Sequence, residues 1–260
     1  LFVSYNMSTN TLELKYPHPR DSHIEFHEPT HTYTIDGSSD YTSVTTWNHT
    51  HFNKFDADKI IDKMMSSKNW KKSKYFGKTA NEIKTEWDNT RDQAAAAGTK
   101  MHYDIECFYN EMKVENDSVE YKYFKDFVND HKHLKPYRTE WTVWDSKLKI
   151  AGSIDMVFEN ADKTLSIYDW KRSKKIIRNK HFEEYSTTDC ISHIPDTNFW
   201  HYALQLNTYK ALIERNYNKK VTKLCLVCLH PNQTSYELFE VPELEEEMSM
   251  LFKHRTRTIT

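Results

Sequence analysis

Glycine is scarce in this chain, with only four glycines in 260 residues. Cysteine is equally rare, and four thiols in a chain of this length suit a reducing compartment without any need for disulfides. Unbroken apolar runs fall far short of the roughly 18 residues needed to span a bilayer. The first ten residues also lack a basic segment followed by an apolar one, so we expect no secretory signal and an intracellular protein with no membrane partner.

A large excess of charge of one sign is also absent. The chain has 36 Lys and Arg residues against 38 Asp and Glu residues, for a formal net charge of −2. Bulk electrostatics therefore argues against a protein that coats nucleic acid, and any basic surface must be local. Two segments qualify, and they are Lys68, Lys71, Lys72, Lys74 and Lys78, followed by Lys171, Arg172, Lys174, Lys175, Arg178 and Lys180.

Aromatic residues are interleaved with the first basic segment. Trp70, Tyr75 and Phe76 could stack on the bases of a single strand beside phosphate contacts made by the lysines. The ordinary alternatives are a solvated lysine face and aromatic side chains packed in a helix core. The sequence leaves both interpretations open.

Hydrophobic periodicity and turn residues predict an α/β (α+β) chain in which helices precede three consecutive strands. Gly98 could interrupt the longest predicted helix, which opens with the capping box Thr79-Ala80-Asn81-Glu82. The predicted elements are a hairpin over 23–36, a short helix capped by Ser43, helices over 56–65, 79–112 and 118–131, strands over 137–144, 150–158 and 164–170, a polar connection over 176–198, a helix over 199–215, strands over 221–229 and 235–241, and a helix after Pro242.

Carboxylates on two neighbouring predicted strands suggest a metal site. Asp169 and Lys171 lie two residues apart and therefore project from the same face. Asp155 lies on the preceding strand, and an antiparallel meander brings residues of adjacent strands within about 5 Å. Two such carboxylates repel each other unless a cation lies between them, and oxygen ligands suit Mg²⁺ or Mn²⁺. Taken without its neighbours, the segment Asp169-Trp170-Lys171 could equally hold an ordinary ion pair between Asp169 and Lys171.

A cation held in this way could acidify and orient a water for attack on a phosphodiester and neutralise the charge that develops. Lys171 could position or deprotonate the nucleophile, or stabilise the transition-state charge. The sequence does not choose between these roles.

Motifs elsewhere in the chain favour a metal site over an ordinary ion pair. Gly98-Thr99-Lys100-Met101-His102 lies on the long predicted helix, Glu140 lies on the first strand, and Gln205 and Tyr209 share one face of a later helix. Together with Gly152-Ser153-Ile154-Asp155 and Asp169-Trp170-Lys171, this set resembles the PD-(D/E)XK nuclease superfamily. Within it, the set is similar to the RecB-like exonuclease branch, which includes the RecB and AddB nuclease domains and the mitochondrial genome maintenance exonuclease. The resemblance runs from about Gly98 to Tyr209.

The resemblance implies a single nuclease domain over 1–260 with a restriction-endonuclease-like core, in which helices flank a mixed central sheet. The core would span 79–241, after an N-terminal, mostly helical extension over 1–78 and before a C-terminal helix over 242–260. It also implies catalytic roles for Lys171, Asp155, Asp169 and Glu140. The implied ligands of one or two Mg²⁺ or Mn²⁺ ions are His102, Asp155, Asp169 and the backbone carbonyl of Trp170, with Glu140 acting through water. The implied DNA contacts are Gln205, Tyr209, Ser43 and Thr45. Arg172 and Lys174, from the second basic segment, are further candidates for DNA contacts.

One position departs from the superfamily pattern, because Ile154 stands where the name-giving proline would be. Some relatives hold an iron–sulfur cluster with four cysteines. Here Cys225 and Cys228 lie in an apolar predicted strand, which favours buried thiols, and we expect no cluster. Paired histidines, as at His49 and His51, lack the cysteine partners of a zinc finger.

The resulting expectation is a Mg²⁺- or Mn²⁺-dependent deoxyribonuclease, an exonuclease on single-stranded DNA or DNA with free ends. It would serve replication, recombination, repair or viral genome processing, with a helicase or replication partner on another chain. The alternatives are a structure-specific endonuclease, a non-catalytic DNA-binding module that keeps the fold, and a metal-dependent hydrolase of another substrate.

Overall fold

The computed structural model describes residues 11–179 and 184–259. They form two compact units: a larger one, made of the chain up to Asn53 and from Met101 onward, and a smaller one from Lys54 to Lys100. The expectations about the first ten residues and about Lys180 lie outside the described residues. No helix in the described ranges is both long enough and apolar enough to cross a membrane.

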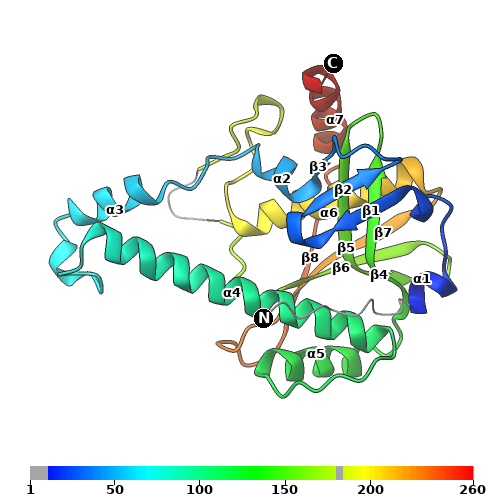
Figure 1. The fold of residues 1–260 in the computed structure, drawn as a ribbon, viewed down its shortest axis with the longest axis horizontal. Coiled ribbons are helices and arrows are strands. Elements are labelled where there is room, and N and C mark those ends of the chain that lie inside the picture. The colour runs from blue at the N-terminus through cyan, green and yellow to red at the C-terminus, as the bar shows by residue number, and fades with distance from the viewer. Residues whose placement is uncertain (1–10, 180–183, 260) are drawn as a thin grey trace. The chain divides into compact units, whose positions relative to one another are not determined.

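A mixed sheet lies at the centre of the larger unit (Figure 1). Its strands in the described residues are β3 (Thr42–Ser43), β4 (Lys135–Asp145), β5 (Ile150–Glu159), β6 (Leu165–Lys171), β7 (Val221–Cys228) and β8 (Glu237–Glu240). β4, β5 and β6 pair antiparallel in chain order, which is the meander that the sequence predicts. β7 pairs parallel to β6, and the crossover that such a pair needs contains α6 (Asn198–Asn216).

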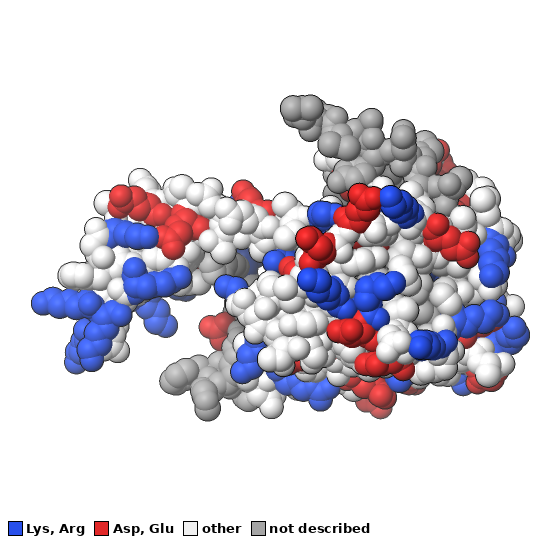
Figure 2. Space-filling view, turned by 90° about the horizontal axis from the view of Figure 1, so that it is seen from below, with Lys and Arg blue, Asp and Glu red and all other residues white. Residues whose placement is uncertain are grey.

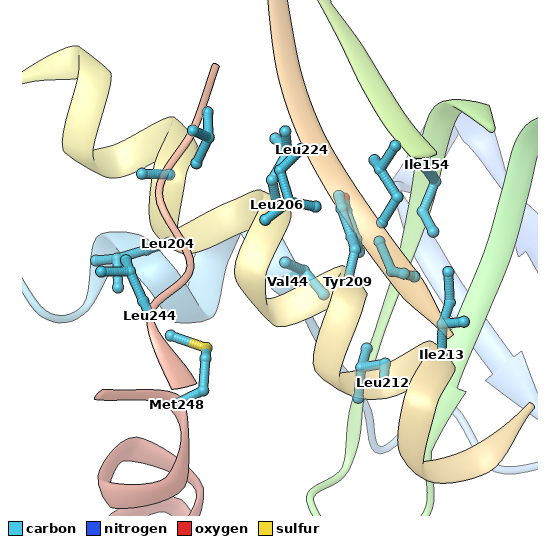
Figure 3. Packing of buried hydrophobic residues seen from close by; sticks show 14 of the residues in the cluster. Val44, Ile154, Leu204, Leu206, Tyr209, Leu212, Ile213, Leu224, Leu244 and Met248 are labelled. Atoms are coloured by element: carbon cyan, nitrogen blue, oxygen red, sulfur yellow. The ribbon is translucent and has the colours of Figure 1, made fainter. Parts of the chain in front are cut away.

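Helices cover both faces of this sheet. One face packs against α5 (Val119–Asp130) and against the last two turns of α4 (Ala80–Tyr109). The other face packs against α6, α2 (Val44–His49) and α7 (Glu245–Ile259). Figure 3 shows Leu206 and Tyr209 of α6 pointing toward Leu224 and Ile154 of the sheet. The predicted mixed central sheet flanked by helices is therefore confirmed.

An N-terminal hairpin lies beside the sheet, after the short helix α1 (Thr11–Lys15). Its strands are β1 (Ile24–His27) and β2 (Thr32–Ile35), which pair antiparallel around a 3-10 turn. The buried side chains of Ile24, Tyr33 and Ile35 pack with Trp144 and Ala151 of the sheet. The sequence-predicted hairpin is thus confirmed, and it has a hydrophobic attachment to the core.

Side-chain caps begin several helices where the sequence predicts them. The Ser43 hydroxyl accepts a hydrogen bond from the Thr46 N–H at the start of α2. In the capping box of α4, the Thr79 N–H donates to Glu82 and the Glu82 N–H donates to the Thr79 hydroxyl. These bonds satisfy N–H groups that have no partner inside the helix. Gly98 does not interrupt α4, which runs unbroken from Ala80 to Tyr109.

The smaller unit contains α3 (Ala57–Met65), a 3-10 turn over Trp70–Lys72 and the part of α4 up to Lys100. Tyr75 is held inside it, because the Trp87 indole N–H donates to its hydroxyl at 2.8 Å. Phe76 behaves differently, since 54% of its surface is exposed. Of the three aromatic residues singled out from the sequence, Phe76 is therefore the one most open to a ligand.

Candidate metal centre

Asp155 and Asp169 lie where two neighbouring strands part. The ladder between β5 and β6 ends with the pair Met156 and Tyr168, so the two aspartates come directly beyond the last paired residues. The Trp170 N–H donates to Asp155 Oδ2 at 2.9 Å in place of a further ladder bond. This separation of the strands leaves room for side chains, and the backbone of β6 fixes the orientation of one carboxylate.

Three potential ligands from three elements meet at this point. His102 of α4, Glu140 of β4 and Asp155 of β5 each offer one ligand atom, and these atoms lie within 4.8 Å of one another. His102 Nδ1 is 3.4 Å from Asp155 Oδ2, and 30% of the imidazole side chain is exposed. One imidazole nitrogen and two carboxylate oxygens are donors that suit Mn²⁺, Mg²⁺ or Zn²⁺. The group could hold a metal ion.

Glu140 occupies an unusual backbone conformation in the middle of β4. Its φ of +43° is in the left-handed region, which costs a residue other than glycine about 1–3 kcal/mol. The Ser153 hydroxyl donates to Glu140 Oε2 at 2.7 Å. Burial, together with the charges of Asp155, Glu106 and Asp169, raises the pKa of Glu140 to about 8. Its carboxylate is a member of the three-residue group, and metal binding by Glu140 through a water stays a prediction.

Asp169 lies next to this group and is engaged by Lys171. The Lys171 Nζ is 2.6 Å from Asp169 Oδ2, and only 3% of the aspartate side chain is exposed. Burial and the charge of Asp155 raise the pKa of Asp169 to about 6, against the opposing effect of the Lys171 ammonium. Burial alone would lower the pKa of Lys171, but Asp169 and Asp155 outweigh it and raise that pKa above its ordinary value. The cation therefore stays charged beside the metal group.

Gln205 and Tyr209 of α6 stand behind Lys171. The Gln205 side-chain oxygen accepts from Lys171 Nζ at 3.5 Å, and its NH₂ donates to the Tyr209 hydroxyl at 3.3 Å. The Tyr202 ring centre lies 4.6 Å from the same ammonium. These contacts hold the lysine from the side of α6, opposite its own strand.

Close packing at Gly152 brings Tyr209 to this position. A Cβ atom at Gly152 would stand 2.9 Å from Tyr209 Cε1 and 3.0 Å from Val44 Cγ2. Real Cβ contacts are essentially never this short, so only glycine fits here without a shift of its neighbours. The glycine of the Gly-Ser-Ile-Asp motif thus lets α2 and α6 approach β5.

One cavity of about 450 Å³ is lined by the three potential ligands and by Lys171, Gln205 and Tyr209, whereas Asp169 is not among its lining residues. Its floor includes the three potential ligands and Lys171, and its walls come from the hairpin, α2 and α6. The lining residues that the sequence analysis did not single out for the site are Phe26, His31, Tyr33, Asn48, His49, Ser153, His201 and Tyr202. A sequence signal existed for His201, one turn before Gln205 on the same helix face, and for Glu106, one turn after His102.

The remaining predicted DNA contacts are distributed unevenly. Thr45 lines the cavity, while Ser43 is occupied as the cap of α2. Arg172 forms an ion pair with Glu120 at 2.6 Å, and Lys174 is exposed to solvent. Neither basic residue is among those that line the cavity. A contact of Arg172 or Lys174 with DNA stays a prediction, as does ligation by the carbonyl of Trp170.

The four cysteines lie on three different elements of the described chain. All four are free thiols, and Cys107, Cys225 and Cys228 are buried. The last two lie on β7 within the packed sheet, as expected from their apolar surroundings in the sequence. Burial raises the pKa of Cys225 to about 11, which keeps this thiol protonated.

Comparison with known proteins gives distant likenesses to solved structures. No protein-family model and no curated protein matches the chain. Among solved structures, the crystal structure of SSO0001 is 13% identical with a TM-score of 0.37, covering 86% of this chain and 78% of that one. A "Putative exonuclease" from Eubacterium rectale is 11% identical with a TM-score of 0.40, covering 85% of this chain and 80% of that one.

Proposed function

We propose that this chain is a Mg²⁺- or Mn²⁺-dependent deoxyribonuclease that hydrolyses phosphodiester bonds of DNA, starting from free ends. One observation carries the proposal: the ligand atoms of His102, Glu140 and Asp155 gather in a cavity that also holds the ammonium of Lys171. Metal ligands beside a fixed cation are the two components that stabilise charge on a phosphate undergoing substitution.

The donor set fits a divalent cation. Glu140, Asp155 and Asp169 crowd three carboxyl groups together, and their mutual repulsion is offset only in part by Lys171. A divalent ion between Glu140 and Asp155 would remove that repulsion, and His102 would complete three protein ligands. When bound, the ion would supply an acidified water and neutralise developing charge on the phosphate oxygens.

The chain's own residues would set the geometry of the reaction. The Trp170 N–H and the Ser153 hydroxyl orient the carboxylates of Asp155 and Glu140. Lys171, held by Asp169 and Gln205, would direct its positive charge at the phosphate as negative charge builds up there. Such preorganised charge costs no rearrangement during the reaction, which is why a fixed lysine suits the role.

A local basic surface supports nucleic acid as the substrate. Residues 54–78 hold eight lysines and three aspartates, so this segment of the smaller unit carries a net charge of +5. Figure 2 shows Lys and Arg side chains clustered on the smaller unit. Phe55 and Phe76 are 73% and 54% exposed there. Cations next to exposed aromatic rings suit a single strand, whose phosphates and bases can bind together.

The decisive test compares DNA substrates and metal conditions. End-labelled linear DNA and closed circles, each single- and double-stranded, are incubated with Mg²⁺, Mn²⁺ or EDTA. We expect cleavage of linear DNA that EDTA abolishes, and loss of at least about 100-fold in Asp155→Asn. Asp117→Asn, at an exposed aspartate of the larger unit, serves as the matched control and should cleave normally.

Each other outcome selects a different function. Equal rates on closed circles would replace the exonuclease with an endonuclease. DNA retention without cleavage in any metal would favour the non-catalytic binding module. Hydrolysis of small phosphoesters but not of DNA would favour a hydrolase of another substrate class.

The basic surface has its own test. Replacing Lys68, Lys71 and Lys72 together with Gln should reduce the slope of log affinity against log salt for single-stranded DNA by roughly 2, at about 0.7 per phosphate contact. The control replaces Lys147, Lys219 and Lys223, which are lysines of the larger unit. An equal change in both triple variants would mean that the smaller unit has no special share in binding.

A further inference from the structure

The hairpin places an aromatic wall beside the metal centre. Phe26, His31 and Tyr33, from the hairpin of β1 and β2, line the same cavity as His102, Glu140 and Asp155. The hairpin forms a separate two-stranded sheet and adds no strand to the main one. Tyr33 and Phe26 also belong to the hydrophobic cluster that attaches the hairpin to the sheet, but Phe26 is only partly buried there and lines the cavity.

Tyr33 forms the fixed base of this wall. Tyr33 is 4% exposed, packs with Trp144 and Ala151 of the main sheet, and lines the cavity together with Ser153. Phe26 stacks on Tyr33 with ring centres 4.5 Å apart and planes inclined by 27°. His31, at the αL position that ends the hairpin turn, meets Phe26 edge-on at 5.2 Å. Phe26 is thus held in one orientation while remaining only partly buried.

The cavity offers two different chemistries at a short distance. The metal group carries two carboxylates, which would repel a phosphate unless a metal ion is bound between them. The hairpin wall presents a planar apolar ring with no carboxylate of its own in the cavity. A volume of about 450 Å³ falls in the range of pockets that hold one small ligand, which is the scale of a single nucleotide. Together, the metal group and the hairpin wall would accept a phosphate that is joined to a flat, uncharged ring system.

We propose that Phe26, backed by Tyr33, forms a nucleobase subsite that stacks on the base next to the scissile phosphate. This inference rests on the proposed nuclease function and adds a binding residue from outside the predicted core. Every base has a π-face, so a stacking site of this kind tolerates any sequence. It would position the nucleotide so that its phosphate faces the metal group.

The test combines protein variants with abasic DNA. One set of oligonucleotides carries a single abasic nucleotide at successive positions from the labelled end. For the wild type, kcat/KM should fall roughly tenfold when the abasic nucleotide flanks the scissile phosphate, and less elsewhere. Phe26→Ala should lose a similar factor on ordinary DNA, and Phe26→Trp should retain the rate. Leu238→Ala, at an exposed apolar residue on β8, is the control and should not change it.

Assaying Phe26→Ala on the abasic DNA shows whether Phe26 and the base contact each other. If Phe26 stacks on that base, Phe26→Ala should lose nothing further on the abasic substrate at the critical position. Multiplicative losses, or an unchanged rate in Phe26→Ala, would overturn the subsite while leaving the nuclease function intact. A wild type that cleaves no DNA would instead remove the nuclease function, and the subsite with it. The abasic series in the wild type also tests the subsite if Phe26→Ala fails to fold.

Discussion

His102 Nδ1 lies 3.4 Å from Asp155 Oδ2, although one residue belongs to a helix and the other to a strand. The same carboxylate oxygen accepts the Trp170 backbone N–H. Asp155 is therefore approached from α4 and from β6 at once. A ligand fixed from two elements needs little rearrangement when an ion binds, and this favours a site that is formed before its metal arrives.

Lys171→Met should separate metal binding from turnover. We expect cleavage to fall by about 100-fold or more, since the fixed positive charge is lost, while Mn²⁺ affinity is kept. Calorimetric titration with Mn²⁺ and end-label assays measure the two quantities, with Lys147→Met as a control at an exposed lysine. Asp169 loses its partner in this variant, so the assays belong at a temperature where circular dichroism shows a folded chain. Unchanged turnover would remove Lys171 from the reaction.

Gly152→Ala should destabilise the chain, whereas Gly98→Ala should not. The new methyl at Gly152 would press on Tyr209 and Val44, and we expect a loss of about 1–3 kcal/mol in the free energy of unfolding. At Gly98 a Cβ meets no described atom within 4 Å, so alanine should stabilise α4 by roughly 0.5–1 kcal/mol. Urea denaturation measures both. Equal effects of the two substitutions would contradict the close packing at Gly152.

His51 should make the chain sensitive to acid. Burial, with the nearby charges of His254 and Arg255, lowers the pKa of His51 to about 4 from an ordinary 6.5. Between pH 6.5 and 4, His51 is protonated in the unfolded chain but stays neutral in the folded chain. The stability that this group contributes is therefore complete above pH 6.5 and is lost between pH 6.5 and 4. The loss amounts to about 3 kcal/mol at most.

His51→Asn provides the comparison. Asparagine can keep a hydrogen bond to Thr188, which His51 Nδ1 contacts at 3.0 Å, but it does not titrate. Urea unfolding at pH 7.5 and at pH 4.5 should show a smaller difference in the variant than in the wild type. The variant also loses ring packing against Trp47, which lowers its stability at both pH values and leaves the comparison intact. An identical pH dependence in both proteins would contradict a buried neutral His51.

Local signals made much of the fold predictable. Ser43, Thr79 and Ser118 cap the helices that the sequence places after them, because capping depends on residues three positions apart. The meander followed from three short β-rich segments with brief turns. The order of helix, three strands, helix and strand could be recognised for the same reason.

The surroundings of the site were less accessible to sequence reasoning. The walls of the cavity come from the hairpin, α2 and α6, and their convergence depends on tertiary packing that no local spacing encodes. Phe26 has no sequence feature that separates it from an ordinary hairpin residue, whereas His201 shares a helix face with Gln205. The left-handed backbone of Glu140 was also hidden, because no glycine or asparagine marks that position.

The left-handed backbone conformation of Glu140 opposes the stability of the fold to the function of the site. A glycine there would relax the chain at once, yet it would also take away one of the three oxygen and nitrogen donors. Raising the heat stability of this chain would therefore be easy at Glu140, but the substitution would leave Asp155 as the remaining carboxylate of the three-residue group.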